Sequence, residues 1–160
     1  MALGVLWCCS VLSASAQVQV DHYYIISNVS NGKVLSTGGK DAKDAPLVGE
    51  TLQKNSPNQL WQLKKSEPDA VALYNPFAEL AVDLAIKSNK GPLLWSLDVT
   101  NPNQQLILEP EGNNFRLRAA SYQHEELYLA VTSGGRVMLE FEKTKNSLFK
   151  FTETDIKNIK

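Results

Sequence analysis

Few side chains in this sequence could take part in catalysis, and they are scattered. Glu140 and Glu142 are two residues apart and would face the same side of a β-strand, as paired carboxylates can in glycoside hydrolysis. They stand in the charged stretch EFEK, which is more typical of a solvated strand edge. His22 and His124 lack metal-ligand spacing, and no G-x-S-x-G, H-E-x-x-H or phosphate-binding glycine motif occurs. We therefore expect no enzyme, no metal site and no cofactor.

The composition indicates a compact globular protein. The chain has 160 residues, of which 43% are hydrophobic, enough for one domain with a core of its own. Its 16 basic and 17 acidic residues are well mixed and give a net charge of −1. No basic stripe indicates a nucleic-acid partner, and no acidic block indicates disorder.

The N-terminal segment differs from the rest of the chain. Residues 1–16 carry no charge and end in Ser-Ala-Ser-Ala, which fits a signal-peptide cleavage site after Ala16. The apolar run is too short for a membrane span. We expect residues 1–16 to be removed and residues 17–160 to form a secreted domain; the alternative is a buried first strand or helix. Both cysteines, Cys8 and Cys9, would be lost with this segment, so the domain must be held by its core alone.

An internal repeat organises the remainder. NQLWQL at 58–63 matches NQQLIL at 103–108 and, more distantly, NSLFKF at 146–151. The large apolar residues of these copies, Trp61, Leu106 and Phe149, are spaced 45 and 43 residues apart. Repeats of this length indicate structural units that bury their apolar faces against one another.

Each unit contains four short β-type runs separated by turns rich in Asn, Gly, Pro and Ser. The first three runs of the units are 23–26, 34–35 and 46–48, then 71–74, 80–82 and 92–95, and finally 115–117, 128–131 and 136–139; the fourth run carries the large apolar residue. No long stretch has a 3.6-residue period. Three blades are too few for a propeller. We therefore predict an all-β fold, a β-trefoil of three pseudo-repeats, with Trp61, Leu106 and Phe149 in one core.

The repeated motif resembles the Gln-x-Trp motif of the ricin-B-type lectins, the R-type β-trefoils. Gln59-Leu60-Trp61 matches it fully, Gln104-Gln105-Leu106 keeps the glutamine, and Ser147-Leu148-Phe149 keeps only an aromatic residue. The resemblance extends over about residues 21–152. It implies one shallow sugar pocket per unit, in which an Asp accepts bonds from two adjacent sugar hydroxyls, an aromatic ring stacks on the sugar, and an Asn completes the polar ring.

The second unit matches this pattern best. The resemblance assigns carbohydrate binding to Asp83, Trp95, Asn103 and Gln104. Each of these residues also has a possible structural role: Trp95 could belong to the core, Asp83 could cap a local turn, and the Gln104 amide could bond the backbone of a loop. We expect Asp83 on an exposed loop.

The other two pockets read as degenerate. In the first unit the Asp is replaced by Ser36 and the aromatic residue by Val48 or Gly49, and only Asn58 and Gln59 remain. In the third unit the Asp is replaced by Ala130 and the aromatic residue by Leu139, and only Asn146 remains. We expect Asp41 and Asp44 on a solvated loop. The predicted function is that of a lectin or carbohydrate-binding module for glycans or glycoproteins, with a galactose-like ligand. The alternative is a β-trefoil protease inhibitor or protein-interaction domain that uses surface loops. The triplet Asn28-Val29-Ser30 matches the N-glycosylation sequon.

Overall fold

The computed structural model describes residues 17–67, 69–121 and 126–159. The predicted signal peptide, residues 1–16, lies outside the described residues, as does His124. Within the described part no helix is long and apolar enough to span a bilayer.

The described chain forms strands and single 3₁₀ turns. Its twelve strands are β1 (Tyr23–Asn28), β2 (Val34–Ser36), β3 (Val48–Glu50), β4 (Trp61–Ser66), β5 (Ala70–Asn75), β6 (Leu80–Asp83), β7 (Leu93–Trp95), β8 (Leu106–Glu111), β9 (Asn114–Ala119), β10 (Tyr128–Val131), β11 (Val137–Glu140) and β12 (Leu148–Glu153). The 3₁₀ turns are η1 (Pro57–Gln59), η2 (Pro102–Gln104), η3 (Lys145–Ser147) and η4 (Ile156–Asn158). Each predicted run therefore lies in or next to a strand.

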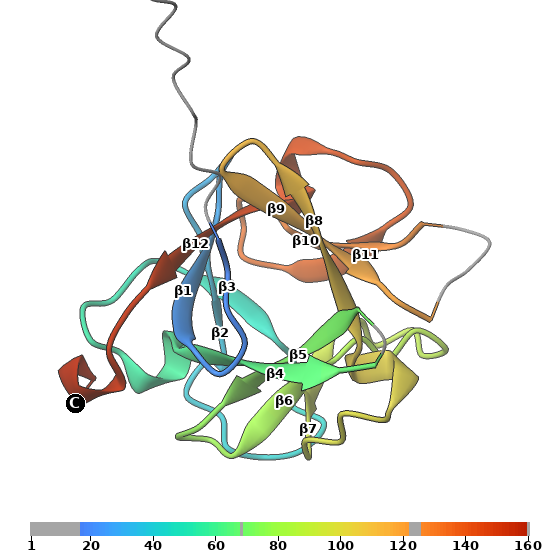
Figure 1. Ribbon diagram of the computed structural model, residues 1–160. Helices are drawn as coiled ribbons and strands as arrows, with labels where there is room; N and C mark the ends of the chain where they lie inside the picture. Colours follow the sequence, from blue (N-terminus) through green and yellow to red (C-terminus); the bar gives the residue numbers. More distant parts are fainter. Residues whose placement is uncertain (1–16, 68, 122–125, 160) are drawn as a thin grey trace, which may run out of the picture.

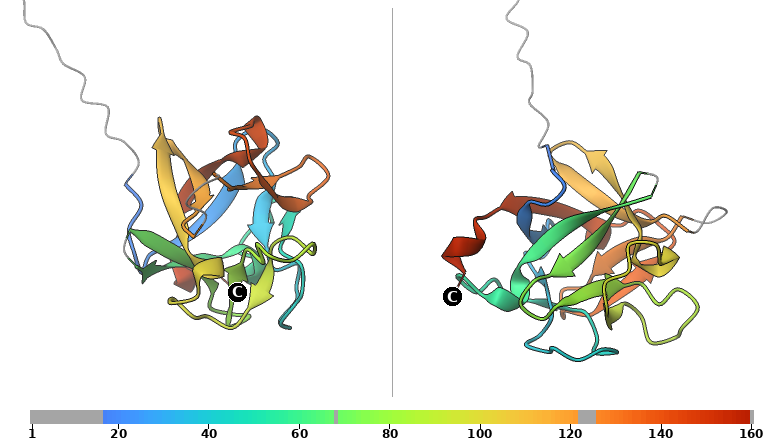
Figure 2. Two further views of the ribbon diagram at one scale, coloured as in Figure 1. Left: turned by 90° about the vertical axis from the view of Figure 1, so that its right-hand side faces the viewer. Right: turned by 60° about the horizontal axis from the view of Figure 1, so that its bottom comes forward.

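Six of the strands close into a barrel. β1 pairs with β4, β4 with β5, β5 with β8, β8 with β9, β9 with β12, and β12 with β1, all antiparallel. The ring returns to its starting strand, so none of the six has an open edge. Figures 1 and 2 show the three units, coloured from blue to red along the chain, arranged around a common centre.

The other six strands form three hairpins, β2–β3, β6–β7 and β10–β11. Each is attached to the barrel strand before it, β1, β5 or β9. Isolated bridges between Pro46 and Leu93 and between Val48 and Arg136 join neighbouring hairpins. Together the barrel and the hairpins make the β-trefoil that the repeat predicts.

The three repeated apolar residues lie in one core. Trp61 and Phe149 are fully buried, Leu106 is 1% exposed, and all three belong to the same hydrophobic cluster. The Trp61 indole N–H donates to the Leu35 carbonyl oxygen at 2.9 Å, so its polar atom is satisfied within the core. The predicted common core is confirmed.

A 3₁₀ turn precedes each of the strands that carry these residues. In the first two units proline begins the turn, where its fixed φ is favourable and its missing N–H costs nothing. Two buried asparagines fasten these turns to the neighbouring unit: Asn75 Nδ2 donates to the carbonyl oxygens of Pro57 and Leu60, and Asn28 Nδ2 to those of Asn146 and Leu148. The sequon amide at Asn28 is thus buried and bonded, and the folded structure leaves no surface there for a glycan.

Candidate functional site

A shallow hollow opens on the second unit, with a volume of about 320 Å³. Three of the four predicted site residues, Asp83, Trp95 and Asn103, line it. The end of β6, the end of β7 and the 3₁₀ turn η2 supply them. The remaining lining residues are Asp44, Ala85, Lys87, Ser88 and Leu93.

Asp83 is not on an exposed loop, as the sequence suggested, but is the last residue of β6 and only 7% exposed. Its Oδ1 accepts the backbone N–H of Ala85 at 2.9 Å. The bond holds a turn at which Ala85 takes a positive φ of 48°. Asp83 therefore caps a local turn and faces the hollow with the same carboxylate.

The second oxygen of Asp83 is held by two side-chain amides. Oδ2 accepts from Asn101 Nδ2 at 3.3 Å and from Gln104 Nε2 at 3.4 Å. A carboxylate oxygen offers two lone pairs, so Oδ2 is already occupied while Oδ1 keeps one lone pair. The carboxylate thus has room for one strong bond from a ligand hydroxyl, fewer than the two that the resemblance implies.

Gln104 is fully buried, so it does not reach a ligand directly. Its Nε2 donates to the Ser96 carbonyl oxygen at 2.8 Å, and its Oε1 accepts the Asp98 N–H at 2.9 Å. Gln59 makes the equivalent bonds to Thr51 and Gln53 in the first unit. The glutamine of the motif is therefore a structural residue that ties loop backbone and, in the second unit, also supports Asp83.

Asn103 is half-buried at the rim of the hollow. Its backbone carbonyl accepts the Leu84 N–H at 2.7 Å, which joins η2 to the end of β6. Among the described residues its side-chain amide has no hydrogen-bond partner. That amide can therefore donate to and accept from a ligand.

Trp95 is not a core residue. Its neighbour Leu94 is fully buried, whereas the Trp95 side chain, on the opposite face of β7, is 42% exposed. The ring thus offers a flat apolar surface at the edge of a hollow that also contains a carboxylate and a free amide.

The first unit also contributes to this hollow, a contact that no sequence pattern indicated. Its loop 40–45 reaches β7, where Asp44 N–H donates to the Leu94 carbonyl and Leu94 N–H to the Ala45 carbonyl. Asp44 lines the hollow and forms an ion pair with Lys90 at 2.5 Å. Lys43 places its Nζ 5.6 Å from the centroid of the Trp95 ring.

Strand register corrects the equivalent positions in the other units by one or two residues. Trp95 lies opposite Ala81, and the matching pairs are Glu50 opposite Val34 and Glu140 opposite Tyr128. Glu50 and Glu140 therefore replace the aromatic residue, rather than Val48 or Gly49 and Leu139. Because successive side chains of a strand face opposite sides, the shift decides which of them faces the ligand.

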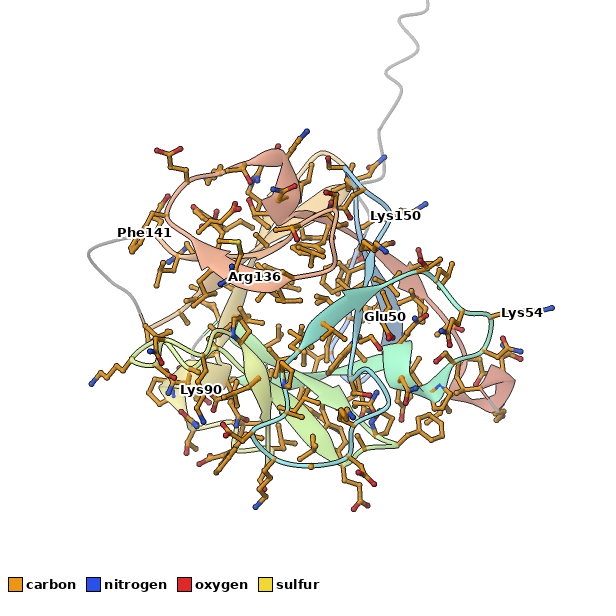
Figure 3. All side chains as sticks on the ribbon, turned by 180° about the vertical axis from the view of Figure 1, so that it is seen from behind. Glu50, Lys54, Lys90, Arg136, Phe141 and Lys150 are labelled. Atoms are coloured by element: carbon orange, nitrogen blue, oxygen red, sulfur yellow. The ribbon has the colours of Figure 1, made fainter. Side chains whose placement is uncertain are left out.

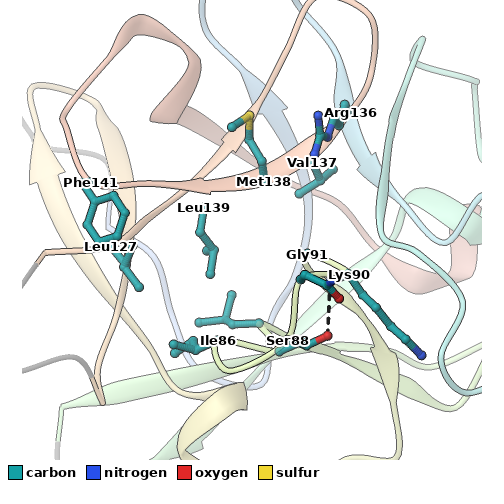
Figure 4. A pocket seen from close by; sticks show the side chains of 13 residues that line it. Ile86, Ser88, Lys90, Gly91, Leu127, Arg136, Val137, Met138, Leu139 and Phe141 are labelled. Carbon is teal, nitrogen blue, oxygen red and sulfur yellow. Dashed lines mark hydrogen bonds between the residues drawn. The ribbon is translucent and has the colours of Figure 1, made fainter.

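A second hollow, of about 280 Å³, lies between the loop that follows Asp83 and strand β11. Apolar and polar side chains share its walls; Ile86, Leu127, Leu139 and Phe141 line it together with Ser88, Lys90 and Arg136 (Figure 4). Ala85 and Ser88 line both hollows.

The carboxylate pair considered for catalysis does not form on a strand. β11 ends at Glu140, and Glu142 follows in a bend. Glu140 accepts a bond from the Thr144 hydroxyl at 2.6 Å. Within the described residues no group of three or more His, Cys, Asp or Glu side chains is arranged to hold a metal ion.

A model of the family described as ricin-type beta-trefoil lectin domain-like matches residues 12–92, just over half of the chain. No curated protein matches the chain.

Many solved structures share the fold at low sequence identity. The designed threefold-symmetric protein ThreeFoil is 20% identical, with a TM-score of 0.72 over 82% of this chain and 99% of its own. SeviL bound to asialo-GM1 saccharide is 15% identical, with a TM-score of 0.67 over 85% and 100%. The Polyporus squamosus lectin, bound to a human-type influenza-binding epitope, is 17% identical, with a TM-score of 0.66 over 86% and 50%. At these identities the likeness concerns the fold.

In some of these structures the trefoil is one part of a larger protein. The chain spans 18% of a mosquitocidal holotoxin, 33% of an endo-β-galactosidase from Clostridium perfringens and 31% of an exo-β-1,3-galactanase from Clostridium thermocellum.

Proposed function

The chain belongs to the ricin-type β-trefoil lectin domain-like family, whose fold supports carbohydrate binding in general, and from that premise we propose that it binds glycans through the hollow on its second unit. The observation that carries the proposal is the convergence of Asp83, Trp95 and Asn103 on one hollow. These residues come from three different elements, β6, β7 and η2.

Each of the three has a separate role toward a sugar. The free lone pair of Asp83 Oδ1 accepts one ring hydroxyl in a charge-assisted bond. The exposed ring of Trp95 stacks on the apolar C–H face of the pyranose. The unpartnered amide of Asn103 bonds a further hydroxyl. A galactose-like sugar is proposed as the ligand by family resemblance alone.

The site is expected to bind weakly. It is open and shallow, and neither the hollow beside β11 nor the one lined by Leu52 and Ile159 combines an acid, an aromatic ring and a free amide. A single site of this kind corresponds to a dissociation constant on the order of millimolar, about −4 kcal/mol. Useful avidity would require several copies or a multivalent glycan.

We also propose that the protein binds its ligand without chemical conversion. The carboxylates in the hollow, Asp83 and Asp44, are held by turn and side-chain amides and by Lys90, respectively. Both carboxylates are thus engaged by neighbouring groups, whereas glycoside hydrolysis needs one carboxyl group as general acid and a second as base or nucleophile.

The test compares the sugar affinity of the parent with that of variants in which one ligand-facing residue of the hollow is replaced. Trp95→Ala and Asn103→Ala should each fold normally, because Trp95 is exposed and the Asn103 amide bonds no described residue. Isothermal titration with galactose and a glycan array should show about tenfold weaker binding by Trp95→Ala, about 1.4 kcal/mol.

Phe77→Ala is the matched control, since Phe77 is a 48%-exposed aromatic residue of the same unit outside the hollow. It should bind like the parent. If the parent binds no glycan on the array, or if Trp95→Ala binds as well as Phe77→Ala, the proposed function or its site is wrong.

A further inference from the structure

The charged groups around the hollow are not equivalent once their partners are counted. Two carboxylates, Asp83 and Asp44, and one cation, Lys87, line it. Two further cations reach it: Lys43 over the Trp95 ring and Lys90 through Asp44. Together these five groups carry nearly balanced charge. The charge that remains available to a ligand depends on which of the groups already have partners within the protein.

Both carboxylates already have partners within the protein, although Asp83 Oδ1 keeps one lone pair for a hydroxyl. Asp83 accepts from the Ala85 N–H and from the amides of Asn101 and Gln104. Asp44 is paired with Lys90 at 2.5 Å. A ligand therefore meets carboxylates that already have hydrogen-bond or ion-pair partners within the protein.

Two of the lysines are not paired. Lys43 and Lys87 are exposed, and among residues 17–67, 69–121 and 126–159 no carboxylate lies within 4.0 Å of either ammonium group. The charge left for a ligand at this hollow is therefore positive.

Lys43 also changes what stacking on Trp95 requires. Its ammonium lies 5.6 Å from the ring centroid, and this contact is of the cation–π type. A neutral sugar that stacks on that face must displace the ammonium and lose the contact. A sugar with an anionic group displaces it too, but offers the ammonium a new partner at the edge of the ring.

We propose that the hollow selects acidic saccharides, whose carboxylate or sulfate group pairs with Lys43 and Lys87 while the sugar ring stacks on Trp95. This inference rests on the proposed function and specifies its ligand class. The carboxylate and the sulfate ester share the same chemistry here, and the experiment separates them. Asp83 and Asn103 keep their roles toward the hydroxyls.

The test compares galactose, galacturonic acid and galactose 6-sulfate as ligands of the mature chain by titration calorimetry. An acidic sugar should bind about two- to tenfold tighter than galactose, as expected for one or two exposed ion pairs. The preference should shrink when NaCl is raised from about 0.15 M to 1 M, because the screening length falls from about 8 Å to 3 Å.

The variants are Lys43→Ala, Lys87→Ala and the double substitution. The double variant should lose the preference, and Lys43→Ala should bind galactose no more weakly than the parent. Lys54→Ala is the control, because Lys54 is exposed and lies on the opposite side of the molecule from Lys90 in Figure 3; it should keep the preference.

The outcomes separate the two proposals. Tighter binding of either acidic sugar that depends on Lys43 and Lys87 supports the inference, and the better of the two names the anionic group. Equal binding of neutral and acidic sugars, or a preference that survives in the double variant, overturns it while the proposed function stands. Absence of binding to all three sugars and to the array overturns both.

Discussion

At the scale of single residues, Asp83 serves the fold and the hollow together. The carboxylate holds the turn at Ala85 through Oδ1 and gathers Asn101 and Gln104 through Oδ2. Because three donors converge on it, its removal leaves polar groups without partners. Its effects on binding and on stability are therefore inseparable in a simple deletion.

We predict that Asp83→Ala lowers the free energy of unfolding by about 1–3 kcal/mol, the cost of leaving buried donors unpaired. Urea denaturation of the parent and the variant measures this difference. Asn103→Ala should stay within about 0.5 kcal/mol of the parent, since the amide that it removes bonds no described residue. Equal stability of Asp83→Ala and the parent would contradict the described bonds.

Residue patterns predicted some of these roles and missed others. Asp83, Trp95 and Asn103 could be singled out because the pseudo-repeat aligns them with a known pattern. Asn101 could have been noticed, since it precedes a proline at the start of η2 and caps that turn. Lys43 and Asp44 could not, because they reach the hollow from another unit through a contact with β7 that no local pattern encodes.

At the scale of elements, β8 and β9 carry a polar network where the second unit meets the third. Glu109 pairs with Arg118 and Lys143, and the Tyr128 hydroxyl lies between Glu126 and Glu109. Burial alone would raise the pKa of Glu109, but the bonds from Arg118 and Lys143 lower it below its usual range. Burial and the bond to Glu126 raise the pKa of Tyr128 to about 12.

This network predicts a loss of stability in acid. A carboxyl whose pKa is lower in the folded than in the unfolded protein stabilises the fold above its unfolded pKa, about 4.3 for Glu, and loses that contribution as the pH falls through the folded value. Glu109→Gln should be less stable than the parent at pH 7. The difference between the two should narrow between about pH 5 and pH 2 in urea denaturation series. A difference that is constant over this range would exclude the proposed role of Glu109.

Strand register was the least predictable property of the elements. The positions of the runs could be predicted, because turn residues and apolar residues mark them. The pairing could not: Glu50 lies opposite Val34 and Glu140 opposite Tyr128, as Trp95 lies opposite Ala81. A count along short strands cannot fix the pairing to within one residue. Pairing is decided by the turns and by contacts between units.

At the scale of the whole molecule, a closed barrel with a buried pseudo-threefold core leaves the surface loops free to diverge. The trefoil could be predicted because Trp61, Leu106 and Phe149 recur where each unit must meet the others. The hollow on the second unit keeps an acid, an aromatic ring and a free amide.

The N-terminal segment gives a prediction for the whole chain. Residues 1–16 form an uncharged apolar run that ends in small residues, and we propose that they are removed during secretion. N-terminal sequencing of the protein secreted from a host with an active export pathway should begin at or near Gln17. Retention of Met1 on folded protein inside the cell would contradict this proposal.

A titration of the ¹⁵N-labelled protein with galactose, galacturonic acid and galactose 6-sulfate, followed by ¹H–¹⁵N correlation spectra, tests directly whether the hollow on the second unit binds sugar. Sugar binding at the second unit predicts shifts of the Trp95 indole N–H and the Asn103 side-chain amide. The Trp61 indole N–H should not move, because it is buried and bonded to Leu35 in the core. Shifts that leave Trp95 and Asn103 unchanged but cluster on the first or third unit, or no shifts at millimolar sugar, would contradict the claim.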